Sequence, residues 1–128
     1  MPRECEPLIC QSSWSIDHIS AVSLVVLEMA ESVLFYQTIG LEVSFGGPHA
    51  SFTTMRAGQS AINLRQAPTT AGHPWDRVIL RVRGVDALHR DLFAKGLAPS
   101  EVKDAEWGER YFELSDPQGN VISFAELL

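Results

Sequence analysis

The sequence has little cysteine, little basic charge and no long apolar run. Its 128 residues include two cysteines and carry a formal net charge of −6. This acidic balance argues against a nucleic acid partner, because phosphate binding needs a basic face. No stretch reaches the roughly 18 apolar residues of a membrane span, and the segment from Met1 to Trp14 has no apolar core of a signal peptide. We therefore expect a cytoplasmic protein with neither a nucleic acid nor a membrane partner.

Both cysteines, Cys5 and Cys10, lie in the first ten residues, and no histidine is near them. We expect residues 1–15 to form a flexible tail in which these thiols are unpaired. A local disulfide or a metal site in the tail is the alternative.

The two halves of the chain repeat one pattern, which is typical of tandem modules. The segment VVLEMAESVLFYQTIGLEV matches RVRGVDALHRDLFAKGLAP and aligns Gly40 with Gly96. The segment SFTTMRAGQSAINL matches YFELSDPQGNVISF and aligns Phe52 with Phe112. We expect one structural domain built from two units, residues 16–65 and 77–128, which are joined by a Pro/Gly/Thr-rich linker at residues 66–76.

Each unit is expected to contain a strand, a helix and three further strands. Apolar segments rich in β-branched residues open each unit, and Gly40 and Gly96 are expected to end the two helices. Asp86 is the expected N-cap of the second helix. The tetrapeptide Asp116-Pro117-Gln118-Gly119 has the composition of a β-turn. Phe52 is expected in the core, as the repeat partner of Phe112.

The segment WGERYFELSDPQGN, with FYQTIGLEV as a weaker marker, resembles the vicinal oxygen chelate superfamily. That superfamily includes glyoxalase I, extradiol dioxygenases, fosfomycin-resistance enzymes and bleomycin-resistance proteins. The resemblance implies an α+β fold in which two tandem βαβββ modules form a curved eight-stranded mixed sheet around a cavity, with the helices on the outer face. It also implies a homodimer. Because this superfamily carries several chemistries, the function must be argued from the site.

The resemblance places the family's four metal ligands at Ala21, Asn63, Arg77 and Ser123. Alanine offers no donor atom, arginine stays protonated, and Asn and Ser oxygens alone are weak ligands for a catalytic divalent ion. We therefore predict no metal, no cofactor and no catalytic residue. His18, three residues before Ala21, could enter the site only through a local shift of register. A metal-dependent lyase or dioxygenase is the alternative function.

Six residues are the predicted ligand-binding set. Arg77 and Glu113 would set the polarity of the cavity, Trp107 and Tyr111 would stack on the ligand, and Asn63 and Ser123 would donate or accept hydrogen bonds. Two simpler interpretations are that Arg77 and Glu113 only neutralise each other and that Trp107 seals a dimer interface.

The partial resemblance to bleomycin-resistance proteins indicates a protein that binds or sequesters a small organic molecule without a metal. Residues 101–126 contain seven acids against Lys103 and Arg110. This local acidity favours a cationic aromatic ligand, although such a charge run is commonly just a solvated surface. A third possibility is a partner-binding subunit whose cavity is filled.

Overall fold

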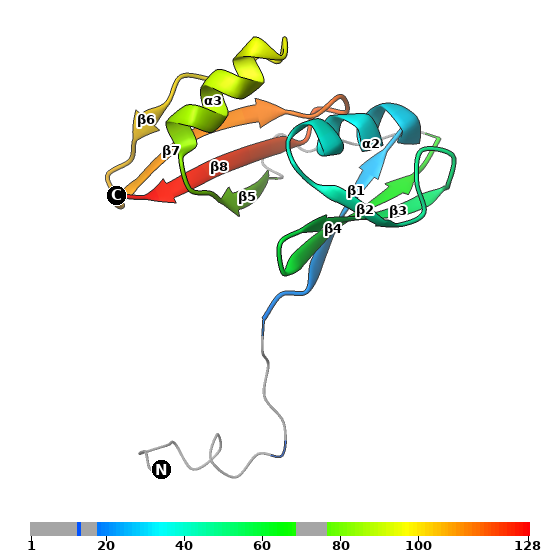
Figure 1. The fold of residues 1–128 in the computed structure, drawn as a ribbon. Coiled ribbons are helices and arrows are strands. Elements are labelled where there is room, and N and C mark those ends of the chain that lie inside the picture. The colour runs from blue at the N-terminus through cyan, green and yellow to red at the C-terminus, as the bar shows by residue number, and fades with distance from the viewer. Residues whose placement is uncertain (1–12, 14–17, 69–76) are drawn as a thin grey trace.

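The computed structural model describes residue 13 and residues 18–68 and 77–128, which form two βαβββ modules (Figure 1). The first module contains β1 (Ala21–Val26), α2 (Met29–Thr38), β2 (Glu42–Phe45), β3 (Phe52–Ala57) and β4 (Ser60–Gln66). The second contains β5 (Arg77–Arg81), α3 (Val85–Ala94), β6 (Lys103–Asp104), β7 (Glu109–Ser115) and β8 (Val121–Leu127). The predicted α+β class and the tandem arrangement of modules are confirmed.

The eight strands belong to two four-stranded sheets with the same topology. The strand orders are β1-β4-β3-β2 and β5-β8-β7-β6. In each sheet the first pair is parallel and the other two pairs are antiparallel, so both sheets are mixed. Within the described residues no ladder joins β1 to β5, and the two sheets are not closed into one.

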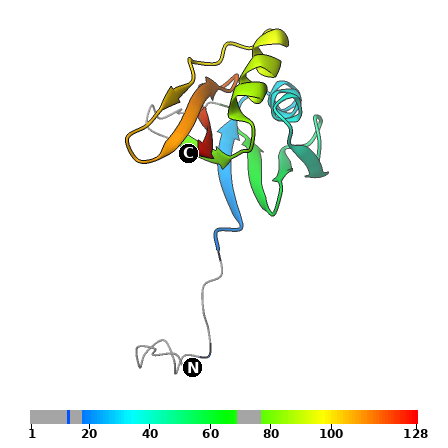
Figure 2. The ribbon, with the colours of Figure 1, turned by 60° about the vertical axis from the view of Figure 1, so that its left-hand side comes forward.

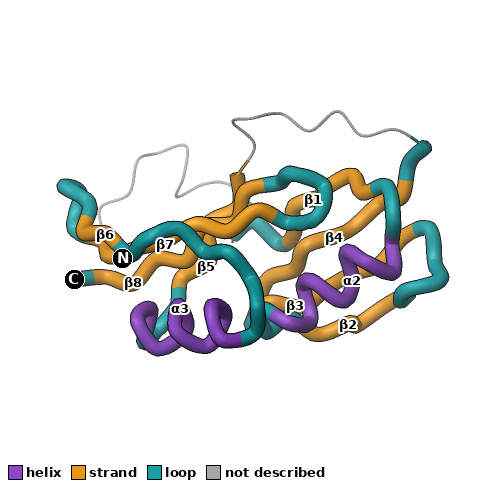
Figure 3. The backbone as a smooth tube through the Cα atoms, turned by 90° about the horizontal axis from the view of Figure 1, so that it is seen from above, coloured by secondary structure: helices purple, strands orange, loops and turns teal. Residues whose placement is uncertain are grey.

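Both helices lie along the same side of the sheets (Figures 1 and 3). Figure 2 views α2 almost along its axis and shows it next to α3. The core lies between helices and sheets, where the stacked rings of Phe112 and Phe124 have centroids 4.8 Å apart and both side chains are buried. Strand alternation sends the intervening side chains to the opposite side. We call that side the open face.

Both helices end in the way that their glycines predict. Gly40 and Gly96 have φ angles of 111° and 89°, the left-handed region that glycine tolerates best. In each case the amide after the glycine donates to a carbonyl five residues back, from Leu41 to Tyr36 and from Leu97 to Leu92. This is the Schellman arrangement. Among the described residues no helix is long and apolar enough to cross a membrane.

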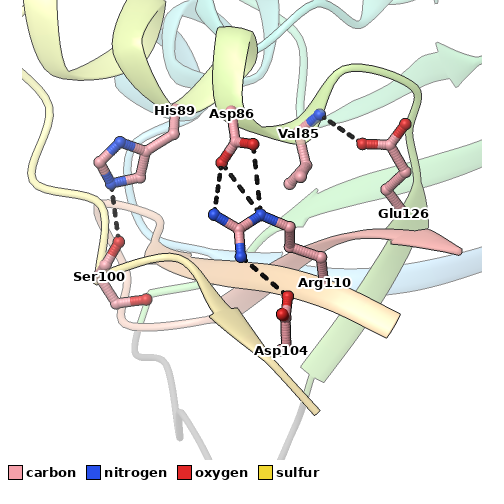
Figure 4. Close-up of polar contacts among 7 residues, drawn as sticks. All are labelled: Val85, Asp86, His89, Ser100, Asp104, Arg110 and Glu126. Carbon is pink, nitrogen blue, oxygen red and sulfur yellow. Dashed lines mark hydrogen bonds and ion pairs between the residues drawn. The ribbon is translucent and has the colours of Figure 1, made fainter. Parts of the chain in front are cut away.

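The prediction that Asp86 caps α3 is wrong. The N-cap is Gly84, at φ 77°, and Asp86 lies in the first turn. The carboxylate of Glu126 accepts the amides of Gly84 and Val85 at 3.0 and 2.9 Å, as Figure 4 shows for Val85. A residue of β8 therefore supplies the cap. Glu126 is 42 residues from Gly84 and 41 residues from Val85 in the sequence.

The prediction that Phe52 lies in the core is also wrong, because its side chain is 37% exposed. The hairpin from β3 to β4 turns between the paired residues Ala57 and Ser60. The hairpin from β7 to β8 is longer, and its register makes Tyr111, opposite Ala125, the equivalent of Phe52. A shift of one residue moves every side chain of a strand to the other face. Thr53 therefore occupies the buried position and Phe52 lies on the open face.

The turn that begins at Asp116 forms as predicted and also links the modules. The amide of Gly119 donates to the carbonyl of Asp116 at 3.0 Å. The buried Asp116 carboxylate accepts the amides of Gln118 and Asn120 and, at 2.6 Å, the hydroxyl of Tyr36 from α2 of the first module. Burial, reinforced by this carboxylate, raises the pKa of Tyr36 well above its ordinary range.

Candidate functional site

The open face of the second sheet brings three of the predicted ligand-binding residues together. Arg77 on β5 donates from Nη1 to Oε2 of Glu113 on β7. The Ser123 hydroxyl, on β8 between those strands, donates to the same carboxylate oxygen at 3.4 Å. Ser123 is directly opposite Glu113 in the ladder and is only 3% exposed, whereas the Arg77 and Glu113 side chains are 45% and 35% exposed. The result is a solvent-accessible polar cluster over a buried hydroxyl.

Asn63 lies on the other sheet, at the position equivalent to Ser123. It is opposite Thr54, whose hydroxyl donates to Asn63 Oδ1 at 2.8 Å. This bond leaves the Asn63 amide nitrogen available as a donor. The polar pair of Asn63 and Thr54 on the first sheet thus mirrors the pair of Ser123 and Glu113 on the second.

Trp107 and Tyr111 form an aromatic platform beside the polar cluster. Their ring centroids are 5.9 Å apart with an interplanar angle of 32°. Trp107 is 68% exposed, and its indole N–H donates to Glu109 Oε1 at 2.9 Å. That bond holds the indole in one orientation while its face remains accessible, which suits stacking on a flat ligand.

A second aromatic pair, which the sequence did not predict, lies on the open face of the first sheet. Phe45 and Phe52 have ring centroids 6.4 Å apart, and Phe45 is 63% exposed. Phe45 reaches the open face through a register irregularity between Val43 and Phe45, which places it opposite Thr54. In the sequence, Phe52 is the residue that could have indicated this pair, but the repeat alignment predicts that it lies in the core.

A cavity of about 700 Å³ lies between the adjacent edges of the two sheets. Its lining is mainly apolar and comes chiefly from β1, β4, β5 and residues 39–41, which follow α2. Of the six predicted ligand-binding residues only Arg77 contributes to it. Four of the other five lie on open-face positions of β4, β7 and β8, and Trp107 lies in the turn before β7.

The residues at the four metal positions do not fit a divalent ion. Arg77 brings a permanent positive charge, which is held by Glu113. Asn63 Oδ1 already accepts from Thr54, and Ala21 has no donor atom. His18 precedes β1 and is exposed. Over residues 18–68 and 77–128, no three His, Cys, Asp or Glu side chains are grouped so that they could hold a metal. Cys5, Cys10 and His73 lie outside the described residues.

Of the seven acids of residues 101–126, two, Glu109 and Glu113, lie on strand positions of the open face. Asp104 pairs with Arg110 at 2.8 Å on the helix side, where Asp86 also contacts Arg110 (Figure 4). Hydrogen bonds to these two carboxylates raise the pKa of Arg110. Glu126 caps α3, and its bonds to the Val85 and Gly84 amides lower its pKa. Acids that favoured a cationic ligand in the sequence, such as Asp104 and Glu126, therefore bind partners on the helix side of the sheet.

Two βαβββ modules whose sheets each leave one face open are the architecture of a known class of proteins. Comparisons with known proteins show which class this is. The family model of the Glyoxalase/Bleomycin resistance protein/Dioxygenase superfamily matches residues 15–124, so the chain belongs to that superfamily. The prediction of a vicinal oxygen chelate protein is confirmed. A search of curated protein sequences found no match.

Solved structures share the fold over nearly the whole chain. The antibiotic-binding protein TnmS3 from Streptomyces sp. CB03234 is 27% identical with a TM-score of 0.75, covering 90% of this chain and 99% of its own. A bleomycin-binding protein in complex with bleomycin is 18% identical with a TM-score of 0.71, covering 88% and 100%. The bleomycin resistance determinant of transposon Tn5 is 16% identical with a TM-score of 0.73, covering 87% and 98%.

Proposed function

We propose that this protein binds a small organic molecule with a flat aromatic part, and that it does so without a metal ion. The observation that carries the proposal is the open face of the second sheet. There Tyr111 lies on the same strand, β7, as the Glu113 carboxylate that bonds Arg77 and Ser123, and the accessible Trp107 packs on Tyr111 from the turn before that strand. Flat ligands are held by stacking, and a few placed polar groups then fix their orientation.

The relatives support binding more than catalysis. TnmS3, the 27% identical neighbour, is an antibiotic-binding protein, and two other neighbours are bleomycin-binding or bleomycin-resistance proteins. The chemistry of the metal positions points the same way, because Ala21, Arg77, Asn63 and Ser123 lack a set of about three good ligands. A homodimer and a cytoplasmic location, both predicted from the sequence, remain predictions.

The first test is metal content. The purified protein would be incubated with Zn²⁺, Ni²⁺, Mn²⁺ or Fe²⁺, dialysed and examined by elemental analysis, together with a variant in which Cys5 and Cys10 are replaced by serine. We expect far less than one metal ion per chain. Stoichiometric metal that persists in the cysteine variant would contradict the proposal and would support lyase or dioxygenase chemistry.

The second test is the aromatic platform. We expect Trp107→Ala to weaken binding of an aromatic ligand by about twofold to tenfold, the range that a lost aromatic contact gives. Phe93→Ala is the matched control, because Phe93 is also 68% exposed but lies on α3. Isothermal titration calorimetry measures both affinities. Equal losses in the two variants would exclude Trp107 from the site.

A further inference from the structure

The net charge of the strand residues on the open face is opposite in sign to the net charge of the whole chain. A charged strand residue lies on this face when the strand pairing puts its side chain on the same side of its sheet as Asn63 or Ser123. Eight residues meet this condition: five bases (Arg56, Arg65, Arg77, Arg81, Lys103) and three acids (Glu42, Glu109, Glu113). The described strand residues of the open face therefore have an excess of two positive charges, although the whole chain carries −6.

Each acid of the open face already has a basic neighbour. Glu113 pairs with Arg77, and Glu109 is 3.7 Å from Arg81. Glu42 is directly opposite Arg56 in the ladder between β2 and β3. A cationic ligand would have to displace one of these bases. Because the two ion pairs occupy the carboxylates, the face offers little to a positively charged molecule.

Two bases remain, and each lies beside an aromatic pair. Lys103 is directly opposite Tyr111, the partner of Trp107. Arg65 is directly opposite Phe52, the partner of Phe45. Over residues 18–68 and 77–128, neither Lys103 nor Arg65 forms a salt bridge, and both are exposed. Side chains directly opposite in antiparallel strands have Cβ atoms about 5 Å apart. Each platform therefore has a cation within reach of a ligand that stacks on it.

From this arrangement we infer that the ligand is an aromatic anion, such as an aromatic carboxylate or phenolate. This inference rests on the proposed function and adds the charge of the ligand. The ring stacks on Trp107 and Tyr111, and its negative group meets Lys103, while Arg65 plays the same part beside Phe52. A charged hydrogen bond from a base to a carboxylate is among the stronger polar contacts.

The test uses three probes with one ring system and different charges: 2-naphthoate, 2-naphthalenemethanol and 2-naphthylmethylamine. Calorimetry in about 50 mM NaCl is expected to give tighter binding of 2-naphthoate than of the alcohol, by about threefold to tenfold. The ammonium probe is expected to bind most weakly. Raising the salt to about 500 mM is expected to reduce the advantage of the anion, since salt screens exposed charges. The net charge of −6 would by itself favour the cation, so an anion preference must be local.

Lys103→Met and Arg65→Met are expected to lower the affinity for 2-naphthoate and to leave that for the alcohol unchanged. Lys95→Met is the control, because Lys95 is an exposed base on the helix side that pairs with Asp91. Equal affinity for all three probes, or tightest binding of the amine, would overturn the inference and leave the proposed function standing. If none of the three probes binds, both are overturned. Loss of anion preference in Lys95→Met as well would show a non-specific charge effect and overturn the inference.

Discussion

Arg77 and Glu113 form an ion pair that solvent still reaches. Their side chains are 45% and 35% exposed, although Ser123 beneath them is buried. Water screens such a pair, so its contribution to stability is small even where the contact is close. The sequence allows two interpretations of this pair, mutual neutralisation and ligand binding. The exposure makes both side chains accessible to a ligand at little cost to the fold.

For Arg77→Met we expect the free energy of unfolding to fall by less than about 1 kcal/mol, because an exposed ion pair contributes little. Urea unfolding measures the change, with Arg90→Met on α3 as an exposed control. A loss of about 3 kcal/mol or more, the size seen when a buried pair is broken, would show that the pair is essential to the fold.

At the scale of the element, α3 begins with a cap that β8 supplies. The sequence around the helix start offers Asp86, yet the amides of Gly84 and Val85 bond Glu126. An anion at a helix N-terminus is stabilised both by the unpaired amides and by the helix dipole. Because Glu126 belongs to the last strand, the contact ties the start of α3 to the sheet on which the helix packs.

Glu126→Gln tests this cap and its dependence on pH. The folded-state pKa of Glu126 lies below the ordinary value of 4.5. The charged carboxylate therefore stabilises the fold at pH values above 4.5, and this stabilisation is lost as the pH falls through the folded-state pKa. We expect the variant to be less stable than the wild type near pH 7 and the two stabilities to converge in acid. Urea unfolding at several pH values measures the difference, with Glu101→Gln as an exposed control. A gap that is independent of pH would contradict the electrostatic role.

At the scale of the whole molecule, the two modules share one hydrophobic core, but few hydrogen bonds join them within the described residues. No hydrogen-bond ladder links the two sheets within the described residues, and a cavity of about 700 Å³ separates their edges. The Tyr36 hydroxyl on Asp116 and the Leu27 amide on Gln118, at 3.1 Å, connect the first module to the turn of the second. These bonds help to set how the two open faces lie relative to each other.

Tyr36→Phe removes the inter-module bond and keeps the buried ring. We expect the free energy of unfolding to fall by about 1–3 kcal/mol, since the buried Asp116 carboxylate loses one of its donors. Tyr111→Phe is the matched control, because within the described residues the Tyr111 hydroxyl makes no hydrogen bond. Thermal or urea unfolding measures both. If the two variants lose the same stability, the bond to Asp116 is not a joint between the modules.

Local features of the fold were predictable from neighbouring residues. Gly40 and Gly96 end helices and Asp116 opens a turn because each conformation depends on a few adjacent residues. The candidate site was predictable in part: the repeat and the family motif placed Arg77, Glu113 and Ser123 on one face, and the structure brings them into contact. Phe45 was not predictable in this way, because it reaches the face through a register irregularity.

The sequence by itself determined the α+β class, the two modules, the family and the absence of a conventional donor set at Ala21, Asn63, Arg77 and Ser123. Only the tertiary structure decided the register of β3, which moved Phe52 from core to open face. It also decided the partner of Glu126 and the sign of the charge on the open face. The physical reason is that helix ends and turns depend on neighbouring residues, whereas strand pairing and ion pairing join residues far apart in the chain, whose distances the sequence alone does not set.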